Sequence, residues 1–572
     1  SKEITIMKKY SKLFGAALVM SCLALTSCDS VFDDLAKNPN QQDVTSFYTT
    51  QENVNKGILG IYSYITTPRA MGASGIRLLV NRGDEESDNT DYGVPGQYCA
   101  TLNASWYTIV QPFSLFYTAA SQACQMIESI PQVEFTNTEL KNAYLGEAYF
   151  WRAFAHWYLF INFRNIPLVK EFPKTAKDYK PQATPEEAWE FIISDLKKAK
   201  ELLPKKGYWK GDNLGRVTSA SATAMLGMSY LYRSGIEPKY GTSTTTYYKE
   251  AAECFDEIIR GDHGTFGLVD NYEDNFRVAT ENNNESIFEF QFKGDVVNTQ
   301  FNPGLTNSGC WRDPRGTQPP SLISENANVA HQWLYDTFVA SKDANGYTDP
   351  RMFGTLVFDD HAPEINAKPG NEVRVFDGKT FDEYYTKTDK DGNTIHGFGI
   401  VSARAGNYKS ACRKGLDWTL PGKNPGDNMW IGYLRANGLN YPFIRYADVL
   451  LMYAESVICG GNQGKLTPVE AVNQVRQRKS VNCPPVASVD MNVIENERIL
   501  ELSGEGHRFY DLLRWGKLAK RFRELEQSDP YFKQYTNSTY LGFQENKNEW
   551  LPIPVDEVEG NPYITKNNPG WN

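Results

Sequence analysis

Four acidic side chains close to residue 85 are the residues most suggestive of catalysis. They are Asp84, Glu85, Glu86 and Asp88. Glycoside hydrolysis uses two carboxyl groups at a fixed separation, one as acid and one as base or nucleophile. Neighbouring carboxylates are also common in solvated loops. We therefore interpret this group as a solvated loop, with the lining of a ligand groove as the alternative.

Other catalytic and metal-binding patterns are missing from the sequence. It contains no His-Glu-x-x-His zinc helix, Gly-x-Ser-x-Gly elbow or dinucleotide fingerprint. Residues 460–466 resemble a phosphate loop, but the spacing is one residue short and Leu466 replaces the Ser or Thr that holds magnesium. Residues 389–393 resemble part of a calcium loop without its glutamate, which favours a hairpin turn. The sequence predicts no catalytic residue, cofactor or metal.

The elements of the first half are predicted to be helices. Apolar residues recur at helical spacing over 54–65, 106–127, 139–163 and 247–260. Thr184-Pro185-Glu186-Glu187 is a capping box with proline at the first helical position, and Thr218 caps a further alanine-rich helix. Consecutive helices of this kind predict a mainly α fold with a stack of pairs like that of TPR proteins, without a strict 34-residue repeat.

The pattern changes near residue 285. Phe288, Phe290 and Phe292 alternate as in a strand. Residues 294–440 are rich in Gly, Pro, Asn and aromatics, with short strands such as 355–358, and a segment of this length is usually functional or disordered. Its aromatics argue against disorder. Helices are predicted again over 441–459, 467–479 and 492–522.

Charge and cysteine content exclude some classes of function. The net charge is −10, and removing residues 1–27 (net +3) gives −10 − 3 = −13 for the remaining chain. Such a surface repels phosphate backbones, so nucleic-acid binding is not expected. The nine cysteines show no C-x-x-C pair or metal-ligand spacing, which favours free, buried thiols, although export would permit a disulfide.

The N-terminal segment has the pattern of a secretory signal followed by a lipid anchor. From Met7 it has a basic start and an apolar stretch over 13–25, too short to span a bilayer comfortably. Leu25-Thr26-Ser27-Cys28 resembles a lipobox, so we expect cleavage before Cys28 and its acylation, with several acyl chains giving stable anchoring. A plain secretory signal is the alternative. Residues 1–6 precede this start and are left out of the fold prediction.

Several motifs in order resemble the SusD/RagB family of outer-membrane nutrient-binding lipoproteins of Bacteroidetes. They cover nearly the whole chain after the signal segment, with Asn567 where the family usually has Gln. In order they are Gly146–Phe160 with Ile166–Val169, Gly215–Thr218, Ile444–Glu455, Glu497–Leu502 with Gly504–Gly516, Pro552–Pro554 and Asn568–Trp571.

The resemblance implies a fold and a function. The fold would be an αα superhelix with TPR-like pairs, divided into an N-terminal region, 28–284, and a C-terminal region, 285–572, whose loops over about 294–440 bind ligand. The function would be non-catalytic capture of a glycan at the cell surface and its delivery to a TonB-dependent, SusC-like transporter. The charges of the motifs, which would pair Arg445 with Asp448, or Glu455 with Arg476 and Arg478, are interpreted as structural. His156 and His507 are interpreted in the same way.

Related proteins bind sugars through loops near the second helix and in the irregular middle. Aromatic faces pack on the C–H faces of sugar rings, while planar polar groups bond to hydroxyls. Trp311 is the first candidate because it lies in a polar, loop-like setting. Trp106 starts a helix and fits a core position equally well. The candidates are Trp311, Arg312, Trp418, Trp430, Trp333, Tyr92, Tyr98 and Trp106.

Three other functions stay open at this stage. A peptide-binding protein of the same family would use strand edges and apolar pockets in place of aromatic faces. A glycoside hydrolase would need two carboxylates at hydrolase separation in a cleft. A TPR-like scaffold would have no concave aromatic cluster.

Overall fold

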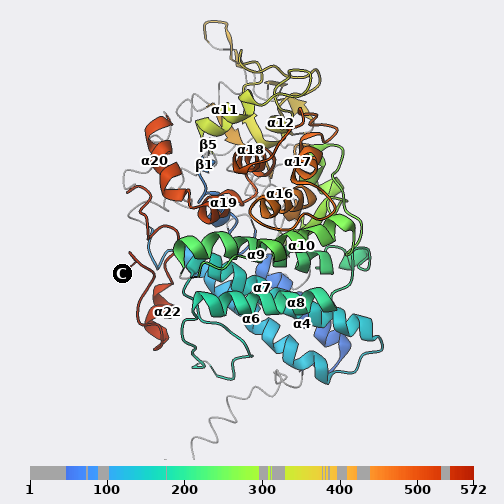
Figure 1. Ribbon diagram of the computed structural model, residues 1–572, viewed down its shortest axis with the longest axis vertical. Coiled ribbons are helices and arrows are strands. Elements are labelled where there is room, and N and C mark those ends of the chain that lie inside the picture. Colours follow the sequence, from blue (N-terminus) through green and yellow to red (C-terminus); the bar gives the residue numbers. More distant parts are fainter. Residues whose placement is uncertain are drawn as a thin grey trace, which may run out of the picture.

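The computed structural model describes residues 47–72, 75–87, 102–294 (except 176 and 242), 307–308, 311, 329–395 with short gaps, 409–420 (except 416), 438–529 and 541–571. Within these residues the fold is mainly α, as the sequence predicts (Figure 1). No helix of the described part is long and apolar enough to cross a membrane.

A stack of helices forms the frame of the molecule. Its members in chain order are α4 (Gln51–Ile65), α6 (Tyr107–Ser129), α7 (Thr138–Phe163), α8 (Pro185–Leu202), α9 (Ser219–Tyr240) and α10 (Tyr248–Arg260). Each packs against the next, and Figure 1 shows α4 to α8 in the lower half with α9 and α10 above them. Successive pairs packed in this way confirm the predicted TPR-like arrangement.

The stack continues after a long insertion. Helix α10 packs directly against α16 (Tyr446–Ile458), although residues 261–445 separate them in the sequence. Helix α16 in turn contacts α17 (Pro468–Arg476) and α18 (Met491–Leu502), and α19 (Arg508–Trp515) packs on α9. The chain ends in α20 (Leu518–Ser528) and α22 (Val555–Gly560).

Local sequence signals set several helix starts. Thr184 and Glu187 form the predicted capping box of α8, and Thr467 and Glu470 form the same box for α17. Thr218 caps α9 together with Ser221. The region predicted as one helix over 492–522 is divided into three, since Ser503–His507 separates α18 from α19 and Gly516, at a φ of 69°, ends α19.

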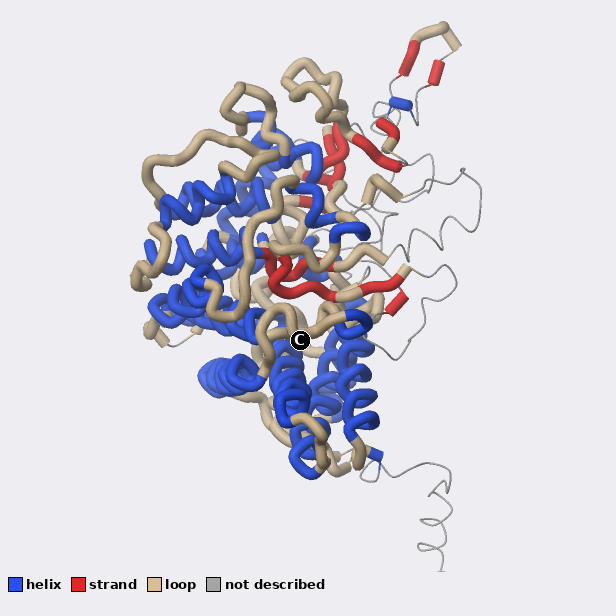
Figure 2. Tube along the Cα trace, turned by 90° about the vertical axis from the view of Figure 1, so that its right-hand side faces the viewer, coloured by secondary structure: helices blue, strands red, loops and turns tan. Residues whose placement is uncertain are grey.

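Strands lie in the insertion and gather toward one side of the upper half (Figure 2). The predicted strand at Phe288 is β2 (Ser286–Phe290), which pairs antiparallel with β12 (Tyr441–Arg445). The prediction that 441–445 begin a helix is therefore wrong, because these residues pair with β2 before α16 starts. Phe288, Phe290 and Phe443 pack edge-on against Phe154 of α7 or tilted to it, which ties the insertion to the stack.

A four-stranded antiparallel sheet joins three strands of the insertion to one strand, β1, from the N-terminal half of the chain. Its strand order is β1 (Glu86–Ser87), β5 (Val329–Ala330), β11 (Ser410–Cys412) and β6 (Leu356–Phe358). Helices α11 (Gln332–Ala340) and α12 (Arg351–Thr355) accompany it and were not expected from the sequence. Strands β9 (Lys387–Thr388) and β10 (Thr394–Ile395) pair antiparallel, which confirms the predicted hairpin. One continuous hydrophobic core contains residues from before and after position 285. The predicted division into two regions at that position stays a prediction.

Candidate functional site

The sheet brings three predicted ligand-binding segments to one of its ends. Ser87 pairs with Val329, so the point where the chain leaves β1 lies beside the point where it enters β5. Ala411 also pairs with Val329 in antiparallel sense, which puts the exit from β11, at Cys412, at this same end. The segments that attach here contain Tyr92 and Tyr98 after β1, Arg312 before β5, and Trp418 and Trp430 after β11.

A second meeting point lies at the end of the β2–β12 pair. A Cβ atom on Gly438 would lie 2.5 Å from the backbone nitrogen of Gly294, so these two chain positions are in direct contact. The Trp311 amide donates to the Leu439 carbonyl at 2.8 Å. Residues at both borders of the predicted binding region are therefore held together, as would be needed if distant segments formed one site.

Trp311, the first candidate from the sequence, lies in the core. Its side chain is 0% exposed, its ring stacks on Tyr441 at a centroid distance of 5.3 Å, and Phe276 lies 5.8 Å away. The prediction that Trp311 is an exposed sugar platform is wrong. The ring fills the space beneath β12, and its loop-like sequence gave no sign of this because Tyr441 is far away in the chain.

Trp418 combines an aromatic ring with several polar groups. The ring is half-buried, and its indole N–H donates to a carboxylate oxygen of Glu273. The Arg277 guanidinium lies 4.6 Å from the ring centroid, a cation–π contact. Arg413 is nearby, buried, and its Nε and Nη2 have no hydrogen-bond partner. These two Arg413 donors are enclosed by protein, so the guanidinium beside the ring that a ligand could reach is that of Arg277, whose side chain is 21% exposed.

Trp333 is surrounded by residues that hold separate parts of the fold together. Its indole N–H donates to the Asp84 carbonyl, and the guanidinium groups of Arg508 and Arg521 lie 5.3 and 4.9 Å from its ring centroid. A cation near the ring competes with a sugar for the aromatic surface; in the described part of the chain two guanidinium groups lie near Trp333 and one lies near Trp418. The half-buried Trp333 is thus a poorer candidate than Trp418.

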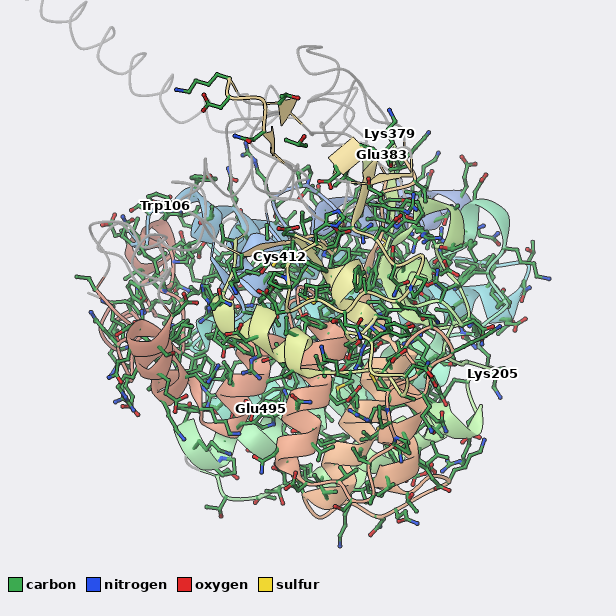
Figure 3. All side chains as sticks on the ribbon, turned by 90° about the horizontal axis from the view of Figure 1, so that it is seen from above. Trp106, Lys205, Lys379, Glu383, Cys412 and Glu495 are labelled. Atoms are coloured by element: carbon green, nitrogen blue, oxygen red, sulfur yellow. The ribbon has the colours of Figure 1, made fainter. Side chains whose placement is uncertain are left out.

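Trp106 lies at the start of α6 with an aromatic neighbour. It is partly buried and stacks on Tyr107, which is 40% exposed, with ring centroids 6.1 Å apart. Figure 3, seen from above, places Trp106 near the edge of the molecule. Tyr107 was not singled out from the sequence, where a tyrosine at a helix start has no distinguishing pattern.

The acidic group at residues 84–86 is not a solvated loop. Asp84 accepts hydrogen bonds from Arg508 Nε at 2.7 Å and Arg521 Nε at 2.8 Å. Burial would raise the pKa of Asp84, but the two guanidinium groups outweigh it and lower the pKa to about 2. Glu85 is also buried, and its carboxylate accepts from the Gly504 amide. Asp84 and Glu85 thus connect the chain just before β1 to α19, to α20 and to the turn before α19.

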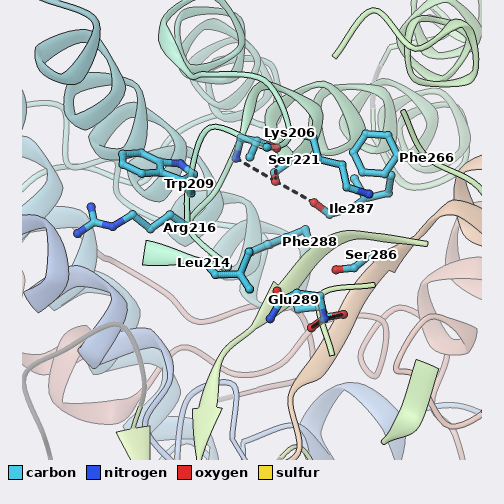
Figure 4. A pocket seen from close by; sticks show the side chains of 14 residues that line it. Lys206, Trp209, Leu214, Arg216, Ser221, Phe266, Ser286, Ile287, Phe288 and Glu289 are labelled. Carbon is cyan, nitrogen blue, oxygen red and sulfur yellow. Dashed lines mark hydrogen bonds between the residues drawn. The ribbon is translucent and has the colours of Figure 1, made fainter. Parts of the chain in front are cut away.

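A separate hollow lies between the loop after α8 and strand β2 (Figure 4). Its space of about 510 Å³ includes the part open to solvent. Both apolar and polar side chains line it, among them Lys206, Leu214, Phe266, Asn282 and Glu289. No sequence pattern singled out these residues. Among the described residues, no three or more side chains gather as a metal site would require.

Comparisons with known proteins identify the family. The model described as "SusD family" matches residues 284–571, half of the chain, and the one described as "Starch-binding associating with outer membrane" matches 35–231. The chain belongs to the SusD family. It is similar to SusD-like protein P2 of Formosa agariphila, 25% identical over 99% of this chain and 100% of that protein. A SusD-like protein of Bacteroides ovatus is 23% identical over 94% and 87%.

Solved structures of other SusD proteins share the fold. A SusD homolog of Bacteroides thetaiotaomicron superposes with a TM-score of 0.69 at 20% identity, covering 93% of this chain and all of that one. Surface glycan-binding protein A of the same organism, solved with laminarihexaose, gives 0.65 at 18% identity, covering 91% of this chain and all of that one.

The SusD signature motifs form a buried ion network here. Arg445 bonds to Glu285 at 2.6 Å, to Glu501 at 3.0 Å and to Glu505 at 2.7 Å, and all four side chains are 0% exposed. Arg478 adds contacts to Glu285 and Glu501. The prediction of paired structural charges is confirmed. The partners proposed from the sequence were wrong, since Asp448 pairs with Arg498 and Glu455 with Arg514.

His156 is structural, as predicted. It is buried, its Nε2 accepts from the Val169 amide at 3.0 Å, and burial lowers its pKa to about 4. Five other predicted positions lie outside the described residues: Tyr92, Tyr98, Arg312, Trp430 and the anchor Cys28. They stay predictions.

Proposed function

We propose that this SusD-family protein is a non-catalytic, cell-surface glycan-binding lipoprotein. It captures oligo- or polysaccharide and delivers it to a TonB-dependent, SusC-like outer-membrane transporter. The observation that carries the proposal is the convergence of Ser87, Val329 and Cys412 at one sheet end, because the aromatic-rich segments attach there. The laminarihexaose bound by a relative of the same fold supports a glycan as the ligand.

Trp418 is the described residue best suited to hold a sugar ring. Its indole N–H is held by Glu273, which fixes the ring, and the partly exposed guanidinium of Arg277 supplies a planar polar group for sugar hydroxyls. Trp106 and Tyr107 offer a second aromatic surface. The buried carboxylates of Asp84 and Glu85 bond to Arg508, Arg521 and Gly504, which supports binding without hydrolysis.

Gel retardation and calorimetry against laminarin, starch, xylan, pectin and mannan test the binding proposal. Trp418→Ala is expected to weaken binding by about tenfold, since stacking contributes on the order of 1 kcal/mol. Tyr179→Ala, in an aromatic 37% exposed on the loop between α7 and α8, is the matched control and should bind normally. Equal binding by both variants would remove Trp418 from the site.

The absence of catalysis is tested on the same polysaccharides. Prolonged incubation should release no reducing ends. Release that disappears on replacing one carboxylate would overturn the non-catalytic assignment. Binding of peptides in preference to every glycan would instead favour the peptide-binding alternative.

The anchor and the transporter are tested separately. Cys28→Ala should release the protein from the membrane fraction, because acylation at Cys28 is proposed to hold it there. A variant that stays in the membrane fraction would contradict the lipid anchor. Co-purification with a co-expressed TonB-dependent transporter from the same locus tests the partnership, and two proteins that elute separately would count against it.

A further inference from the structure

A lysine without a charged partner lies in the hollow beside β2. Lys206 is half-buried, and its ammonium lies 4.1 Å from the centroid of the Phe266 ring. It donates to the Asn284 carbonyl at 3.2 Å and forms no ion pair with a carboxylate in the described part of the chain. Burial lowers its pKa to about 8. Lys206 also donates to the Asn284 side chain at 3.4 Å, which leaves one of its three donors for a ligand.

The opposite side of the hollow is apolar. Leu214 is 50% exposed, one of the most exposed large apolar side chains of the described residues, and it lines the hollow together with Phe288 (Figure 4). An exposed leucine on its own needs no explanation. Here it faces a space that Lys206, Asn282 and Glu289 border with polar atoms.

The loop that carries these residues is fixed before any ligand arrives. The amides of Lys206, Leu214 and Arg216 donate to the carbonyls of His263, Gly211 and Asn213 at 3.0, 2.9 and 3.2 Å. Gly215, at a φ of 91°, lies so close to Gln291 that a Cβ would approach that side chain to 2.2 Å. A preformed hollow loses little conformational entropy on binding.

Hydrogen bonds connect the polar side of the hollow to the predicted ligand-binding region, 294–440. Glu289 accepts from the Asn282 amide and from the Asn440 side chain at 3.2 Å, and Asn440 follows Gly438, which contacts Gly294. Glu289 is buried and its Oε2 already accepts two hydrogen bonds, but its Oε1 accepts one, from the Asn282 amide, and can take another. The hollow thus offers donors, an acceptor and an apolar wall within one small space.

We propose that this hollow is a second glycan-binding site that takes one neutral sugar residue. Leu214 would contact a C–H face of the ring, while Lys206, Asn282 and Glu289 would bond to its hydroxyls. One positive and one negative side chain at the hollow favour an uncharged ligand over an acidic one. The proposal rests on glycan binding by this protein, but the site is separate from the surface at Trp106: Figure 3 places Trp106 and Lys205, the neighbour of Lys206, at opposite sides of the molecule.

The test compares adjacent lysines by mass spectrometry after limited reductive methylation. The probes are laminarihexaose, maltohexaose, cellohexaose, xylohexaose and mannohexaose. The proposal expects at least one of them to protect Lys206 severalfold while leaving the exposed Lys205 unaffected. Absence of selective protection by all five would overturn it, as would protection by a mixed hexapeptide pool but by no sugar.

Paired variants test the apolar wall. Leu214→Ser should lower affinity for the protecting sugar about threefold or more, whereas Leu541→Ser, in a leucine 55% exposed, should not change it. If Trp418→Ala abolishes all binding and Leu214→Ser none, the second site is wrong while the proposed function stands. If no glycan binds the wild-type protein, both fall together.

Discussion

Buried carboxylates behave in opposite ways in the signature helices and beside the irregular insertion. Asp511 and Glu289 are 2% and 7% exposed. Burial would raise the pKa of Asp511, but Arg498 and Arg514 lower it to about 2. The pKa of Glu289 is raised by burial, and its hydrogen bonds only partly oppose this. Neighbouring charge, and not burial, decides the sign.

This difference in pKa indicates different roles for the signature helices and for the insertion. In the helices nearly every buried charge has an opposite charge beside it, so these residues hold the fold. In and near the insertion, Glu289 and Lys206 are buried or half-buried and form no ion pair among the described residues. Groups of that kind are concentrated at functional sites.

Arg445→Met is expected to lower stability most, because it removes a cation from the buried ion network of the signature motifs. Removing this cation leaves Glu285, Glu501 and Glu505 buried with reduced compensation, and losing one partner of such a group costs about 3–5 kcal/mol or more. We expect poor soluble yield and a much lower urea midpoint. Lys479→Met is the matched control, because its pair with Asp270 has side chains 77% and 74% exposed. Equal stability of the two variants would contradict the structural role of the network.

Trp311→Ala tests whether the ring under β12 belongs to the core. Truncating a buried tryptophan lowers the free energy of unfolding by roughly 3–5 kcal/mol. Chemical denaturation measures this, and affinity is then determined below the unfolding transition. A well-folded variant of unchanged stability with weaker glycan binding would restore Trp311 as a binding residue.

The loss of stability at alkaline pH tests a carboxylate of the insertion, Glu281. Burial raises the pKa of Glu281 to about 9, although the Asn440 amide bonds to its carboxylate. Because the pKa is raised in the folded state, protonated Glu281 makes its full contribution to the free energy of unfolding below the ordinary pKa near 4.5. This contribution is lost as the pH rises toward 9.

Glu281→Gln removes this titration and can keep the bond to Asn440. Each pKa unit corresponds to about 1.4 kcal/mol, and partial exposure reduces the effect. The variant should gain on the order of 2 kcal/mol over wild type between pH 5 and pH 9 in urea titrations. Parallel curves across this range would show that Glu281 titrates normally.

Tyr107→Ala should have the smallest effect on stability. The side chain is 40% exposed, so the free energy of unfolding should change by less than about 1 kcal/mol. Glycan affinity should fall severalfold if Tyr107 extends the surface of Trp106. Calorimetry at two ligand lengths measures this, and unchanged affinity for both lengths would exclude Tyr107.

Local patterns were readable from the sequence, whereas distant pairings were not. The Thr184–Glu187 capping box lies within four residues and was predicted correctly. Residues 441–445 were predicted as helix, because nothing in them shows that they pair with 286–290. The burial of Asp84 depends on Arg508 and Arg521, which lie over 400 residues later. The hollow was missed for the same reason, since its walls come from separate segments.

The direct packing of α10 on α16 has a consequence for how such a chain can change over time. Segment 261–445 begins at the end of α10 and ends at the start of α16, and these two helices pack on each other, so the frame itself holds both ends of the segment. Lengthening a flexible loop whose ends are already fixed costs little, about 0.6 kcal/mol for each doubling. The intervening segment can therefore gain, lose or exchange residues while the helices that flank it keep their register. One frame can in this way be fitted to different ligands without being rebuilt.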